Sequence, residues 1–147
     1  MIEVSRSFLR FIQDVDANEE PSLERLAELL DRLLVAYPES SDVAPATETK
    51  PPSGDYGTWR GLVQSRFPDF GLYAWVDPAE NGHDEPMTGD IVDDLADICG
   101  ELSGVVWLWE NSGAGDAVWH FRFGYQKHWG RHLLNARSYL HQALYEV

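Results

Sequence analysis

The sequence predicts an all-α protein, a single helical domain over residues 1–147 that folds as an antiparallel bundle of about five helices with long loops. Every well-patterned segment repeats its apolar residues at intervals of three and four, which is the spacing of an amphipathic helix. A chain of 147 residues has the length of one domain. Its six tryptophans and 12% aromatic residues indicate a packed core rather than a disordered chain.

The first part of the chain predicts two helices followed by a loop. Residues 2–14 carry apolar side chains at helical spacing, which predicts a short amphipathic helix. A second helix is expected to begin at Pro21 or Ser22, because proline suits a first helical turn, and to stop at Pro38. Residues 38–55 hold four prolines among small polar residues and have no period, so they predict a flexible, proline-rich loop.

The middle of the chain predicts a third helix and a stretch without regular structure. Residues 56–67 follow helical spacing, and Pro68 ends the pattern. Residues 71–76, GLYAWV, have the aromatic residues of a strand, but no partner strand is evident and a lone strand is not stable. We therefore expect this segment to be extended chain packed across the helices.

Two long helices should complete the bundle. Thr88 or Asp90 can cap a fourth helix that runs to about Glu110. The turn NSGAGD follows, and Asp116 is the expected N-cap of a last helix that continues, bent or straight, to Tyr145.

These last two helices carry complementary polar stripes. Carboxylates recur along one face of the fourth helix, and imidazoles and cations recur along one face of the last. Arg122 is expected to add a further cation opposite the carboxylates. The predicted polar network consists of Asp94, Asp97, Glu101, His128, Arg131, His132 and Asn135.

Two interpretations of this cluster remain open. In the first, each imidazole donates to a carboxylate in a buried polar network, and no ion is required. In the second, His128 and His132, four residues apart on a helix, bind one divalent metal ion through ring nitrogens, and Asp97 or Asp94 completes the shell. Apart from this alternative, no cofactor is expected.

No residue set in the sequence predicts catalysis. Cys99 is the single cysteine, and it falls near the buried face of its helix, where a thiol is usually inert. The N-terminus lacks the apolar core of a secretory signal, and no apolar run approaches the roughly 20 residues that span a bilayer. We therefore expect a cytoplasmic protein without membrane contact, and a non-enzymatic protein in preference to an enzyme. The metal interpretation leaves a metal-dependent enzyme, with its site between the last two helices, as the alternative.

The charge distribution indicates the kind of partner. The formal net charge is −14, and the interval between Arg66 and Arg122 has no lysine or arginine but twelve acidic residues. Such a surface repels phosphate backbones and favours basic proteins, so nucleic-acid binding is not expected. An inhibitor-like or immunity-like module that docks a basic protein is the predicted function, with Asp84 and Glu85 among its exposed acidic positions.

Two short motifs also carry a family resemblance. DDLADI at residues 93–98, together with HWGRH at residues 128–132, resembles a bacterial family of unknown function. The family pattern places a tyrosine and an Asp-Pro pair before the acidic helix, where this chain has Tyr73 and Asp77-Pro78. The position after DDLADI, usually aromatic, is Cys99 here. The resemblance implies a helical fold and a pairing of the two motifs, but no chemistry.

Overall fold

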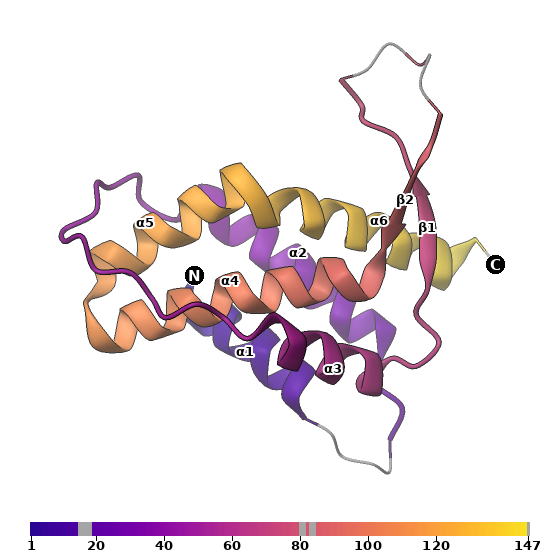
Figure 1. Ribbon diagram of the computed structural model, residues 1–147, viewed down its shortest axis with the longest axis horizontal. Helices are drawn as coiled ribbons and strands as arrows, with labels where there is room; N and C mark the ends of the chain where they lie inside the picture. Colours follow the sequence, from indigo (N-terminus) through magenta and orange to yellow (C-terminus); the bar gives the residue numbers. More distant parts are fainter. Residues whose placement is uncertain (15–18, 80–81, 83–84, 147) are drawn as a thin grey trace.

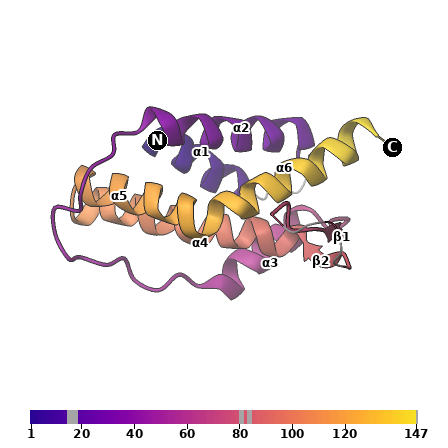
Figure 2. The same ribbon diagram turned by 90° about the horizontal axis from the view of Figure 1, so that it is seen from above.

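The computed structural model describes residues 1–14, 19–79, 82 and 85–146. Within these residues the helices form five rods, because the last two α-helices run on from each other without a break (Figure 1). Viewed from above, α1 and α2 cover one side of the layer formed by α4, α5 and α6, and α3 lies on the other side (Figure 2). The protein is mostly helical, as predicted. It also contains a small two-stranded sheet, which the sequence did not predict.

Helices α1 (Ile2–Gln13) and α2 (Leu23–Glu39) match the expected segments closely. The side chain of Ser22 caps α2 by accepting a hydrogen bond from the backbone N–H of Arg25. Pro38 lies in the last turn of α2, so the helix ends one residue later than expected. The apolar stripes of both helices enter one core, which includes the fully buried side chains of Phe8, Ile12, Leu26, Leu29, Leu30 and Leu33.

Helix α4 (Ile91–Asn111) is the centre of the fold, and α1, α3, α5 and α6 all pack against it. The carboxylate of Asp90 caps its first turn by accepting from the backbone N–H of Val92 at 2.9 Å. Because neighbours surround the helix, its buried residues are spread around its circumference rather than confined to one stripe. The same helix carries the predicted carboxylates, so they lie next to the core.

Residues 41–55, hereafter the strap, connect α2 to α3 (Tyr56–Arg66) without regular structure. The strap turns around the α4–α5 end of the bundle and returns along the face opposite α1 and α2 (Figure 2). Asp55 ends it by capping α3 through the backbone N–H of Thr58. The predicted loop is therefore a covering segment that crosses two helices.

The expectation that residues 71–76 lack a strand partner is wrong. Strand β1 (Leu72–Trp75) pairs antiparallel with β2 (Met87–Asp90), and Tyr73 lies opposite Gly89. The partner was missed because residues 87–90 have no alternating apolar pattern and lead directly into the cap of α4. This sheet carries the Tyr73 ring to the N-terminal end of α4. Asp84, one of the expected exposed acidic positions, lies outside the described residues.

The last rod consists of α5 (Ala114–Gly124), a π-helical turn η1 (Tyr125–Trp129) and α6 (Gly130–Tyr145). Asp116 lies inside the first turn of α5, and Gly113 is the N-cap in its place, so the expected cap position is wrong. The backbone N–H of Gly130 donates to the Tyr125 carbonyl, which closes the wide turn. A Cβ atom on Gly130 would lie 2.3 Å from that carbonyl oxygen, so the turn requires glycine here.

Across the part of the chain that the structure describes, none of the helices combines the length and the apolar character needed to cross a membrane.

Candidate metal centre

The antiparallel packing of α4 against η1 and α6 brings the two predicted motifs together. Asp94, Asp97 and Glu101 recur at three and four residues on α4, so their carboxylates follow one face. His128 in η1 and His132 in α6 face them, and the two imidazole ring centroids lie 4.9 Å apart. The site is therefore built from two rods of the bundle rather than from loops.

The inner end of the cluster is buried, and both oxygens of its carboxylate accept hydrogen bonds. Nδ1 of His132 lies 2.6 Å from Oδ1 of Asp94, so a protonated Nδ1 donates to this carboxylate. The hydroxyl of Tyr73, on β1, donates to the other oxygen of Asp94. The side chains of Asp94 and His132 are only 6% and 11% exposed. The imidazole of His132 is thus held in one orientation, with Nε2 directed away from Asp94.

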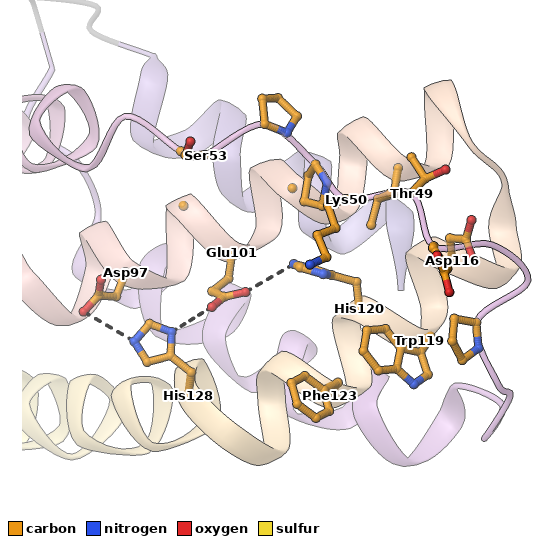
Figure 3. Close-up of a pocket in the computed structure, with 18 of the residues that line it drawn as sticks. Thr49, Lys50, Ser53, Asp97, Glu101, Asp116, Trp119, His120, Phe123 and His128 are labelled. Carbon is orange, nitrogen blue, oxygen red and sulfur yellow. Dashed lines mark hydrogen bonds and ion pairs between the residues drawn. The ribbon is translucent and has the colours of Figure 1, made fainter.

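The outer end repeats the same arrangement nearer to solvent. Nδ1 of His128 lies 2.8 Å from Oε1 of Glu101, and this pairing leaves its Nε2 on the side of Asp97 (Figure 3). The second oxygen of Glu101 lies 3.4 Å from Nε2 of His120 on α5. The His128 side chain is 44% exposed, so an ion can reach this end from solvent.

Between these ends the two free ring nitrogens converge on Asp97. Oδ2 of Asp97 lies 3.4 Å from Nε2 of His132 and 3.9 Å from Nε2 of His128. Asp97, His128 and His132 each offer one ligand atom, and these atoms all lie within 4.8 Å of one another. Tetrahedral bonds of about 2.0–2.1 Å hold two ligand atoms about 3.4 Å apart, so a small closing movement would suit a metal ion.

The pKa values of Asp97 and His132 are both shifted toward the protonated form. Burial raises the pKa of Asp97, and the neighbouring carboxylates of Asp93 and Asp94 add to this rise. Burial tends to lower the pKa of His132, but its hydrogen bond to Asp94 and the charge of Asp97 outweigh burial and raise it. Burial and the bond to Asp94 raise the pKa of Tyr73, so its hydroxyl keeps its proton and stays a donor.

Two residues of the predicted network lie outside this cluster. Arg131 is exposed, and its guanidinium lies 5.3 Å from the centre of the Trp75 ring rather than against a carboxylate. Asn135 lies near the Tyr73 hydroxyl, where it tends to lower the pKa of Tyr73, and among the described residues it forms no hydrogen bond with a histidine. Arg122, expected opposite the carboxylates, instead donates to the carbonyl oxygens of Tyr37 and Ser40 at the end of α2. Backbone carbonyls left free at a helix C-terminus compete for such cations.

A groove of about 940 Å³ opens beside the outer end of the cluster (Figure 3). Its walls are the strap, α4 and α5, and His128 and Asp97 lie at one end. The strap is fastened at the other end by Asp116, which accepts from the backbone N–H groups of Ala46 and Thr47 at 2.8 and 3.0 Å. The hydroxyls of Thr47 and Ser112 also donate to Asp116.

Several residues of this region were missed from the sequence alone. His120 is one of three histidines within thirteen residues of one predicted helix, and that clustering was the available signal. Arg60 of α3, not a cation of the last helix, pairs with Asp90 at 2.8 Å. Tyr73 was noted as a match to the family pattern, but its hydrogen bond to Asp94 was not predicted. Lys50 in the proline-rich loop was not predicted to belong to this region, because its place beside the groove depends on the path of the strap.

Comparison with known proteins places the chain in a family. A model of the family described as Domain of unknown function (DUF5063) matches residues 1–146. The chain belongs to this family. The resemblance to a family of unknown function, which DDLADI and HWGRH indicated, is therefore confirmed.

The family fold is also seen in a solved structure. The crystal structure of protein BF1032 from Bacteroides fragilis is similar to this chain with a TM-score of 0.79 and 17% identity. The match covers 99% of this chain and 90% of that one. At this identity the likeness shows the fold alone. No curated protein matches the chain.

Proposed function

We propose that this protein binds one divalent transition-metal ion through Nε2 of His128, Nε2 of His132 and the carboxylate of Asp97. The observation that supports this most is the gap at the centre of the cluster. The distances of 3.4 and 3.9 Å from Asp97 to the two ring nitrogens exceed those of good hydrogen bonds. A self-sufficient polar network would close these contacts.

The orientation of the two imidazole rings supports the same proposal. Because each Nδ1 lies within hydrogen-bond distance of a carboxylate, each neutral ring carries its proton there and turns an unprotonated Nε2 toward Asp97. In this neutral form two nitrogen lone pairs and a carboxylate face one another, and a proton or a metal ion between them relieves the repulsion. A metal ion satisfies all three, and Asp94 and Glu101 are the outer carboxylates that hold the rings in a ligating orientation.

The ligand set favours a site with an open position. Two imidazoles and one carboxylate are typical of zinc and non-haem iron centres in which water or substrate completes the coordination. The groove beside His128 gives a small molecule access to that position. Metal-assisted chemistry on such a molecule is the corresponding activity. The docking of a basic protein rests on charge alone and stays a prediction.

Metal binding can be tested directly on the full chain purified without a histidine tag. Protein stripped with EDTA and titrated with Co²⁺ should develop visible absorption bands and saturate at one ion per chain. His128→Ala, His132→Ala and Asp97→Asn should each weaken binding by more than about 100-fold, because the loss of a ligand exceeds the loss of an outer-shell partner.

His141→Ala is the matched control, because His141 is exposed on α6 and its ring contacts Glu146 rather than the cluster. It should leave the titration unchanged. If the His141 and His132 variants bind Co²⁺ equally, or if the native chain binds no ion, the proposal is wrong.

A further inference from the structure

The groove under the strap has the dimensions and walls of a small-molecule site. Its volume of about 940 Å³ lies within the range of about 300–1,000 Å³ that ligand pockets occupy. One wall is aromatic: the rings of Trp119 and Phe123 on α5 are stacked, with centroids 4.9 Å apart and planes 11° apart. Phe123 is 46% exposed, so this aromatic surface is open to a ligand.

The strap and α4 form the opposite walls. The strap passes close to α4, where a Cβ atom on Gly104 would lie 3.1 Å from the ring of Pro51 and 3.4 Å from Nε2 of His120. Gly100 and Leu108 of α4 extend this apolar floor. The open face of the aromatic wall lets a flat ring stack against it.

Lys50 offers one position in the groove where an anionic group on that ring could pair with a cation. Of the four carboxylates that line the groove, Glu101 contacts two histidines and Asp116 accepts hydrogen bonds from the strap and from Ser112. Asp97 lies at the end of the groove beside His128. Among the described residues, Lys50 is the single lysine or arginine that lines the groove. Lys50 forms no hydrogen bond or ion pair with another described residue. Lys50 points from the strap into the groove toward His120 (Figure 3).

From these features we infer that the groove binds a planar aromatic ligand carrying one anionic group, with the ring against Trp119 and Phe123 and the anion at Lys50. The remaining charged side chain of the strap that lines the groove, Glu48, is exposed. The inference goes beyond the proposed metal site and does not depend on it, since no proposed metal ligand holds the ring or the anion.

Two fluorescent probes that share one ring system test this inference. The anionic probe 8-anilino-1-naphthalenesulfonate and its neutral counterpart N-phenyl-1-naphthylamine differ in the sulfonate group. With EDTA-treated full-length protein, the anionic probe should bind saturably at one site. Lys50→Gln should raise its Kd about tenfold, the cost of losing one charge-assisted contact, and leave the Kd of the neutral probe unchanged. Trp119→Ala should weaken both probes, and Glu48→Gln should weaken neither.

The chain offers matched controls for both variants. Lys127 is the other lysine and Trp109 is an exposed tryptophan, and neither lines the groove. Lys127→Gln and Trp109→Ala should therefore leave both Kd values unchanged, and near-UV circular dichroism should show native packing in every variant.

Three results would overturn the inference: no saturable binding of the anionic probe, equal effects of Lys50→Gln and Lys127→Gln, or equal effects of Trp119→Ala and Trp109→Ala. Because the probes are measured without metal, these results are independent of the Co²⁺ titration. Failure of either proposal therefore leaves the other standing.

Discussion

Gly89→Ala should destabilise the protein although it adds a single methyl group to a short strand. Gly89 lies opposite Tyr73 in the sheet, and a Cβ atom there would lie 2.2 Å from Cζ, 2.5 Å from Cε2 and 2.7 Å from the hydroxyl oxygen of Tyr73. The ring must therefore move away. The Tyr73 ring is held in place by its hydrogen bond to Asp94 and by the Tyr139 ring, whose centroid lies 5.9 Å from its own.

The size of the effect follows from the hydrogen bond that is lost. A hydrogen bond to a charged group contributes about 1.5–3 kcal/mol, and Gly→Ala restores about 0.4–1 kcal/mol by restricting the unfolded chain. The free energy of unfolding should fall by about 1–2 kcal/mol. Urea denaturation followed by far-UV circular dichroism measures this change as a lower midpoint at constant slope.

Two comparisons make the prediction specific. Gly71 precedes the same sheet, and a Cβ atom there meets nothing within 4 Å, so Gly71→Ala should be neutral or stabilising. In a Tyr73→Phe background the bond to Asp94 is already absent, so Gly89→Ala should cost less than it does in the native chain. Equal midpoints for the Gly89 and Gly71 variants would refute the reasoning.

Three further predictions follow from other contacts. Asp94→Asn should keep one metal ion per chain but weaken its binding by about 10–100-fold in calorimetry, because Asp94 orients His132 without ligating; an unchanged Kd would contradict this. The bonds from Ser112 and then Thr47 lower the pKa of Asp116 to about 2, so its stabilising effect is complete above about pH 4 and is lost toward pH 2. Urea midpoints of Asp116→Asn and the native chain should thus differ at pH 7 and converge at pH 2. The association rate of a basic protein partner should fall as salt is added, because at 0.1 M salt charges are screened beyond about 10 Å. Glu85→Lys should lower the association rate in the same way. An association rate that does not change with salt would contradict docking through the acidic surface.

The helices and their pairing could be predicted because both depend on periodicity. Asp94 and Asp97 recur at helical spacing on one segment and His128 and His132 on another, and antiparallel packing of the two segments is enough to bring them together. The distances from Asp97 to the Nε2 atoms of His128 and His132 could not be predicted. They depend on where each ring places its Nδ1 proton, which is decided by Asp94 and Glu101.

Other features depend on contacts that no local pattern encodes. The sheet pairs two four-residue strands across a long connection, and residues 87–90 show no alternation that would reveal it. Arg122 was assigned to the carboxylates because it lies on the same predicted helix, yet the carbonyls at the end of α2 bind it instead. The strap has no period at all, so the groove and Lys50 become visible only in three dimensions.

The π-helical turn sets the rotational phase between the two halves of the last rod. At about 100° per residue, His120 and His132 would point about 120° apart on an uninterrupted α-helix. One extra residue taken up in the wide turn reduces this angle to about 20°, so both rings face α4. A deletion of one residue within 125–129 would leave eleven steps of regular helix between these two histidines, which gives the same angle of about 20°. The wide turn therefore takes up one residue without changing which faces of α5 and α6 point toward α4, whereas a further residue in regular helical geometry would rotate the groove wall by about 100° away from the histidine pair.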